Sequence, residues 1–156
     1  MELDIGIKKN SRKKITDALK HFLADTYLLY LKTQSFHWNL VGPNFYSLHI
    51  LLEKQYEDMA EAVDEIAERI RALGEFAPGT FAEFKNLSQL KEEKKYLKQN
   101  KMIEILTFDH EKIAKTTKSI IRDSQDEYDD VTADMLIKRI TFHEKSAWML
   151  RSSLEK

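Results

Sequence analysis

The sequence predicts an all-α fold, a four-helix bundle with a short helix between the second and third long helices. Three observations predict it. The 156 residues contain only four Gly and two Pro, most of these breakers fall in two short clusters, and apolar residues recur at spacings of three and four between the clusters. So few breakers argue against a turn-rich β fold. A chain of this length fits one domain over residues 1–156.

The first breaker cluster, Gly42-Pro43-Asn44, separates two expected helices. We expect the first helix over residues 11–38 and the second over residues 45–73, with Asn44 as the N-cap of the second. Four apolar residues of the second helix repeat every seven positions, as in helices that pack in a bundle. They are Leu52, Met59, Ile66 and Leu73.

The second cluster, which ends at Pro78-Gly79-Thr80, precedes the remaining elements. Thr80 is expected to cap a short helix over residues 81–86. The Lys- and Glu-rich residues 88–100 fit either a linker or an early helical turn, and a third long helix follows over residues 101–123. After a polar, acidic stretch, we expect Thr132 to cap a last helix that ends near residue 154.

Composition excludes several classes of protein. The chain has no Cys, which excludes disulfides, thiolate metal sites and cysteine nucleophiles. No apolar run approaches the ~20 residues that cross a bilayer, and the N-terminus lacks the apolar stretch of a signal peptide. The 25 basic and 26 acidic residues nearly cancel. We therefore expect a cytoplasmic protein without membrane contact.

Two pairs of potential metal ligands lie on the second expected helix. His49 and Glu53 are four positions apart, as are Asp64 and Glu68, so each pair shares one face. Imidazole and carboxylate together suit iron, manganese or zinc, and without thiolates iron(II) or manganese fits well.

The two pairs cannot meet within one straight helix, because fifteen residues separate His49 from Asp64, about 22 Å along the axis. Two antiparallel copies of the helix, related by a two-fold axis near Asp58 or Met59, would bring the pairs together. This predicts a metal site between subunits. The alternative is that the acids lie on a solvated face and that His49 is a packed side chain.

The residues from Phe36 to Ile70, FHWNLVGPNFYSLHILLEKQYEDMAEAVDEIAERI, resemble the Dps family, the mini-ferritins known as DNA-binding proteins from starved cells. The C-terminal HEKSAWMLRSSLE is similar to the last helix of that family. The resemblance covers nearly the whole chain. It implies a ferritin-like bundle, assembly as a hollow homo-dodecamer, and oxidation of iron(II), preferentially with hydrogen peroxide, at a ferroxidase site on the two-fold interface. Iron(III) would be stored inside as mineral, which protects against oxidative stress.

The resemblance also assigns residues. His37 and His49 correspond to the histidine ligands of the family, and Asp64 and Glu68 to acids that the partner subunit supplies. Glu53 stands where the family usually has Asp. Trp38 corresponds to the tryptophan beside the site, either as a trap for oxidising equivalents or as an aromatic anchor at the interface. An ordinary ferritin centre within one bundle would need Glu-x-x-His motifs, which the sequence lacks.

Two further surfaces follow from charge and from the resemblance. Asp130 and Asp134 are expected to line an iron pore, with a solvated acidic loop as the alternative. Residues 1–10 are expected to form a short basic tail. DNA contact would use the basic residues Lys8, Lys9, Arg12, Lys13 and Lys14.

The remaining alternative is a nucleoid-associated protein that compacts DNA without catalysis. For the three other histidines, His21, His110 and His143, we expect packing or surface roles.

Overall fold

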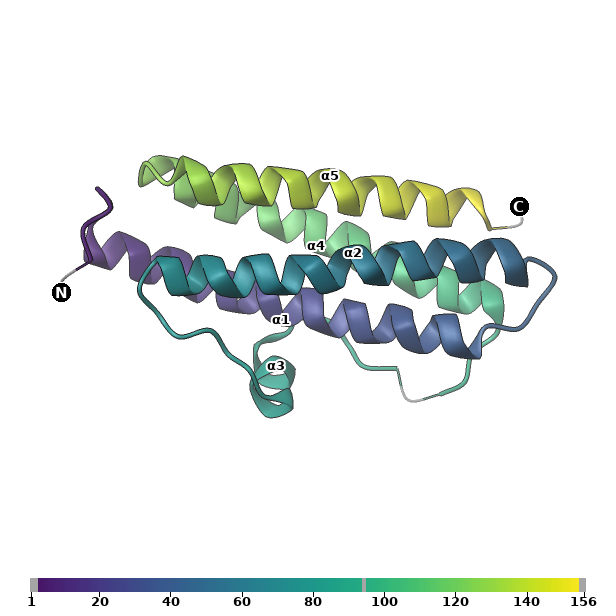
Figure 1. Cartoon of the computed structure of the whole chain (residues 1–156). Coiled ribbons are helices and arrows are strands. Elements are labelled where there is room, and N and C mark those ends of the chain that lie inside the picture. Colours follow the sequence, from purple (N-terminus) through teal and green to yellow (C-terminus); the bar gives the residue numbers. More distant parts are fainter. Residues whose placement is uncertain (1–2, 94, 155–156) are drawn as a thin grey trace.

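The computed structural model describes residues 3–93 and 95–154, and over those residues it contains five α-helices and no strand. The helices are α1 (Lys9–Asn39), α2 (Phe45–Ala72), α3 (Phe81–Leu87), α4 (Gln99–Asp126) and α5 (Asp130–Ser152). The four long helices lie side by side, while α3 stands outside them against α1 (Figure 1). The predicted all-α bundle with a short extra helix is confirmed.

The bundle consists of two antiparallel hairpins, α1–α2 and α4–α5, joined by the long connection that carries α3 (Figure 1). Helix α1 runs antiparallel to α4, because Lys14 pairs with Asp123 at one end and Lys32 with Asp109 farther along. Helix α2 runs antiparallel to α5, because Arg69 contacts Asp129 near the beginning of α5.

The core lies along the shared axis of the four long helices. The heptad residues of α2 that the sequence singled out are at most 1% exposed, and each packs in one apolar cluster with side chains of the other long helices. Burial of such side chains stabilises a fold by roughly 1.5–3 kcal/mol each. The seven-residue repeat therefore marks the face of α2 that holds the bundle together.

Only two of the five helices, α3 and α5, have an N-cap side chain that forms a capping hydrogen bond. Thr80 forms a capping box with Glu83, whose side chain reaches back to the backbone N–H of Thr80. This confirms the predicted cap. Asn44 occupies the N-cap position of α2, but its side chain makes no capping hydrogen bond.

The predicted cap of the last helix is wrong. Helix α5 begins at Asp130, and Asp129 is its N-cap, with a side chain that accepts a hydrogen bond from the backbone N–H of Thr132. Thr132 thus lies inside the first turn rather than before it. A carboxylate three residues before a backbone N–H is a strong cap, which explains why the helix starts earlier than the sequence suggested.

The other bounds shift by a few residues. Residues 88–98 form no helix where the structure describes them, so they act as a linker, and α4 starts at Gln99. Helix α1 starts at Lys9, so the expected basic tail becomes helical at its last two residues. Residues 1 and 2 of that tail lie outside the described residues. Among the described helices, none is long and apolar enough to cross a membrane.

Candidate metal centre

His37 and His49 lie against each other at one end of the α1–α2 hairpin. His37 is near the end of α1 and His49 in the first turns of α2, so the short connection between the helices brings them together. Their rings stack with centroids 3.7 Å apart and planes 16° from parallel. His37 is buried and His49 is half-buried. Two imidazoles of one chain therefore meet beside the surface.

Backbone carbonyls orient both rings. Nδ1 of His37 donates to the carbonyl oxygen of His49 at 2.9 Å, and Nδ1 of His49 donates to the carbonyl oxygen of His37 at 3.1 Å. A carbonyl can only accept, so the proton of each neutral ring sits on Nδ1. Each Nε2 then carries a lone pair. This hydrogen bond from the other ring nitrogen is the arrangement found behind metal-binding histidines.

Aromatic rings flank the stacked histidines on both sides. Phe45 stacks on His49 with centroids 5.0 Å apart, and Tyr56 lies edge-on to His37 at 5.2 Å. Burial, with a smaller contribution from the nearby charges of Glu53 and Glu57, raises the pKa of the Tyr56 hydroxyl. The histidine pair is thus held between two rings and two carbonyls, with little freedom to turn.

The three acidic candidates share helix α2 with His49 but do not gather around it. Glu53 is half-buried one turn away, while Asp64 and Glu68 are exposed farther along the helix. Over the described residues of one chain, no group of three or more His, Asp or Glu side chains could hold a metal ion. In one chain, the two histidines therefore lie apart from Asp64 and Glu68.

Trp38 follows His37 directly and is 63% exposed. It lines a shallow hollow with Phe36 and Ser35 of the same helix. A large aromatic side chain this exposed in a single chain is available to a neighbouring molecule.

The two acids expected at a pore are exposed at the start of α5. Asp134 pairs with Lys138 one turn later, at 2.7 Å, and this contact raises the pKa of Lys138. Their neighbour Asp129 has a different role, which sequence reasoning missed. Its side chain is fully buried and accepts from Arg69 Nη2 at 2.6 Å, so it ties α5 to α2. Its position three residues before Thr132 was the available signal.

Two of the five basic residues near the N-terminus have partners within the chain. Lys8 precedes α1, and the other four lie on that helix. Arg12 donates to the carbonyl oxygen of Ile7, and Lys14 pairs with Asp123. Lys8, Lys9 and Lys13 are exposed.

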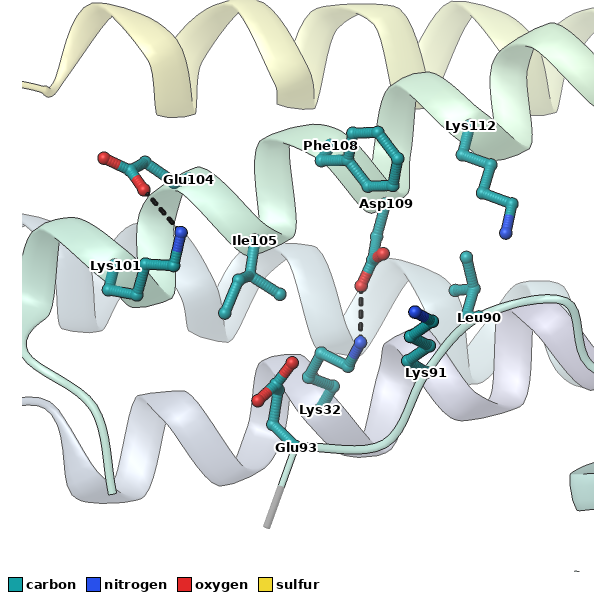
Figure 2. Close-up of a pocket in the computed structure, with 10 residues that line it drawn as sticks. All are labelled: Lys32, Leu90, Lys91, Glu93, Lys101, Glu104, Ile105, Phe108, Asp109 and Lys112. Carbon is teal, nitrogen blue, oxygen red and sulfur yellow. Dashed lines mark hydrogen bonds and ion pairs between the residues drawn. The ribbon is translucent and has the colours of Figure 1, made fainter. Parts of the chain in front are cut away.

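A second feature that sequence reasoning missed is a buried ion pair between α1 and α4. Lys32 Nζ lies 2.6 Å from Asp109 Oδ2 at the inner wall of an open hollow of about 470 Å³, whose rim carries Lys91, Lys101 and Lys112 (Figure 2). Burial raises the pKa of Asp109, against the opposing effect of Lys32. This hollow contains none of the candidate metal ligands.

The remaining histidines have the expected packing and surface roles. His21 is exposed and bonds through Nδ1 to the carbonyl oxygen of Leu87. His110 and His143 are completely buried and contact each other.

Comparison with known proteins agrees with this architecture. The model of the ferritin-like domain family matches residues 16–156. The chain is 40% identical over 155 residues to an uncharacterized low temperature-induced protein of Nostoc sp., covering 98% of this chain and 87% of that protein. It is 34% identical over 142 residues to DNA protection during starvation protein 2 of Bacillus anthracis, covering 91% and 97%.

Among solved structures, Dps from Staphylococcus aureus superposes with a TM-score of 0.88 at 36% identity, covering 92% of this chain and 97% of that one. Sequence and fold thus agree over nearly the whole length. The family is one of iron storage and protection. The chain belongs to the ferritin-like family and, within it, to the Dps proteins.

Proposed function

We propose that this protein oxidises iron(II) with hydrogen peroxide, or with oxygen, at a site shared by two subunits, and stores the iron(III) as mineral inside a hollow dodecamer. The stacked pair of His37 and His49 is the observation that carries the proposal. Its two Nε2 atoms offer neutral nitrogen ligands, held by hydrogen bonds from Nδ1 to backbone carbonyls. Such ligands suit iron(II).

Two imidazoles alone leave iron without the carboxylates that favour the more highly charged iron(III). Asp64 and Glu68 are exposed on α2, but they lie too far from His37 and His49 to bind the same metal ion within one chain. A second copy of α2, antiparallel about a two-fold axis near Asp58 or Met59, would bring its acids to the histidines. Glu53, one turn from His49, would ligate iron or hold its ligands in place.

Oxidation of two iron(II) ions balances the reduction of one hydrogen peroxide. Two iron(II) ions bound at the shared site each give one electron to one peroxide, whose O–O bond breaks, and two protons complete two water molecules. Pairing the electrons avoids release of hydroxyl radical. Trp38, next to His37, would accept an oxidising equivalent that escapes. Asp130 and Asp134 would attract the iron(II) cations toward a pore.

The direct test loads metal-free protein with iron(II) without oxygen and then adds peroxide. Iron(III) absorbance and particle mass are followed together. We expect rapid oxidation with the iron retained in a particle of dodecamer mass. Slow oxidation with precipitate outside the particle would contradict the proposal.

A mixed assembly tests the sharing of the site between subunits. His49→Ala and Asp64→Ala chains are each expected to be inactive alone. In a mixed dimer, one of the two sites receives His49 from one chain and Asp64 from the other, both intact. Random pairing should therefore restore about a quarter of the wild-type oxidation rate. No recovery would place all the ligands of a site in one subunit.

DNA binding is a second proposed function, favoured by the exposure of Lys8, Lys9 and Lys13 at the beginning of α1. Three cations per subunit, repeated over an assembly, provide many weak phosphate contacts. A gel shift at two salt concentrations, with and without chelator, tests it. Salt-sensitive binding combined with absent iron oxidation would favour the non-catalytic, nucleoid-compacting alternative.

A further inference from the structure

A polar layer crosses the interior of the bundle, and each long helix supplies one residue to it. These are Thr33 of α1, Gln55 of α2, His110 of α4 and His143 of α5. All four are at most 3% exposed. Among the described residues, no hydrogen-bond partner exists for Thr33 Oγ1, for either amide atom of Gln55, or for Nε2 of either histidine.

Contacts between α1, α4 and α5 set three of these residues at one height. Lys32 pairs with Asp109, so the next residues along the two helices, Thr33 and His110, lie within about one helical turn of each other. His110 and His143 touch directly, with their Nδ1 atoms 2.8 Å apart.

Contacts of α2 set the fourth residue at the same height. Asp58 pairs with Arg139 at 2.7 Å. Because α2 and α5 run antiparallel, Gln55, three residues before Asp58, lies level with His143, four residues after Arg139. On the other side of α2, Tyr56 contacts Tyr30 of α1 with ring centroids 6.2 Å apart, which brings Gln55 to within about one turn of Thr33.

A buried donor or acceptor without a partner costs roughly 1–3 kcal/mol, and more than about nine in ten buried polar groups in native proteins are paired with protein or with ordered water. No described side chain or backbone group pairs with these five atoms. A layer lined by apolar residues would avoid this cost. The four side chains therefore indicate a small ligand that supplies their missing hydrogen bonds.

The tautomers of the histidines define what that ligand must do. In the bond between the two Nδ1 atoms, one ring donates and the other accepts. The donating ring has a bare Nε2, whereas the accepting ring, when neutral, must carry its proton on Nε2. The layer thus presents one donor and one acceptor from its histidines, and donors and acceptors from Gln55 and Thr33.

A metal cation fits this layer poorly. Only one Nε2 has a lone pair while the bond between the Nδ1 atoms persists, and no carboxylate is available in the layer itself. Burial lowers the pKa of both histidines, and the positive charge of the Arg139 guanidinium lowers it further. A neutral molecule that both donates and accepts avoids each of these conflicts.

We propose that the polar layer is a buried binding site for water inside each subunit, in which water bridges His110 and His143 to Gln55 and Thr33. A buried water typically makes about three hydrogen bonds, which these side chains can supply. The layer lies one helical turn from His37 on α1, so it adjoins the metal centre without sharing a ligand with it. The water site therefore does not depend on the proposed iron chemistry.

A high-resolution crystal structure of the metal-free protein tests the proposal directly. We expect density peaks at about 2.7–3.2 Å from both Nε2 atoms. A dry layer would overturn the proposal. After a zinc soak, a peak with anomalous scattering at Nε2 would overturn it in favour of a metal site.

Variants test the same proposal in solution. Long-lived internal water is counted by magnetic relaxation dispersion, and we expect the double variant His110→Leu/His143→Leu to lose it, while His21→Leu keeps it. The single variant His143→Leu leaves His110 without its partner and should lower the Tm by about 3–10 °C. An unchanged water count in the double variant would overturn the proposal, whatever its stability.

Discussion

The molecule contains two histidine pairs that use the same side chain in opposite ways. His37 and His49 stack beside the surface, and each donates from Nδ1 to a backbone carbonyl of the other. His110 and His143 are fully buried and bond to each other through Nδ1. The partner of Nδ1 decides what Nε2 offers. The carbonyls leave two lone pairs in the first pair, whereas the mutual bond leaves one lone pair and one N–H in the second.

The largest expected effect is on the rate of iron(II) oxidation when the stacked pair is changed. His37→Ala removes one ligand and the ring that stacks on His49, while the backbone carbonyl that orients His49 remains. We therefore expect the rate of iron(II) oxidation to fall by more than about 100-fold. The stopped-flow rate of iron(III) formation after peroxide addition measures it. The matched control is His21→Ala, which also loses a histidine bonded to a carbonyl but should keep the wild-type rate. A normal rate in His37→Ala would contradict the assigned site.

The second prediction concerns the pH dependence of the free energy of unfolding, to which the buried pair should contribute. Burial lowers the pKa of His110 from 6.5 to about 3, so below pH 6.5 the unfolded chain binds a proton that the folded chain does not. The free energy of unfolding therefore decreases as the pH falls. Between pH 7 and pH 5 we expect a loss of about 2 kcal/mol from this residue.

Urea unfolding at the two pH values measures this loss. In His110→Leu/His143→Leu the dependence on pH should be weaker, because both neutral rings are gone. Equal dependence in the wild type and the double variant would show that the buried pair is not its source.

The smallest effect tests supply of iron rather than its binding at the stacked pair. Asp130→Asn combined with Asp134→Asn removes two exposed charges, and we expect iron uptake to slow by about two- to tenfold at low salt. Oxidation of iron already bound should be unchanged. Glu104→Gln is the matched control, since Glu104 is another exposed acid and pairs with Lys101 of its own helix, α4. Equal uptake in both variants would exclude a pore at the start of α5.

The sequence allowed the helices to be predicted to within about three residues, because Gly and Pro mark the breaks around α1, α2 and α3 and apolar periodicity marks α4 and α5. It also led to His37 and His49 as candidates. It could not show that their rings stack, because that contact depends on the geometry of the α1–α2 connection. The predicted start of α5 was wrong because two candidate caps, Asp129 and Thr132, lie three residues apart, and the carboxylate of Asp129 caps the backbone N–H of Thr132. The contact of Asp129 with Arg69 of α2 could not be predicted, because it forms only when the helices pack.

The buried groups were the least predictable. His110 and His143 are 33 positions apart, and Lys32 and Asp109 are 77 apart. No local pattern relates such residues, since each pair forms only when α1 packs on α4 or α4 on α5. Periodicity showed which residues face the core, but not which polar residues meet there.

The way in which the two hairpins join also bears on how the chain folds. The hydrogen bonds and ion pairs that join α1 to α4 and its C-cap connect residues 77 to 116 positions apart, from Lys32–Asp109 to Ser11–Glu127. The α1–α2 and α4–α5 hairpins close over connections of only a few residues. Loop-closure entropy therefore favours early formation of each hairpin and late docking of one on the other. The Lys32–Asp109 ion pair, which needs both hairpins in place, should be among the last contacts to form.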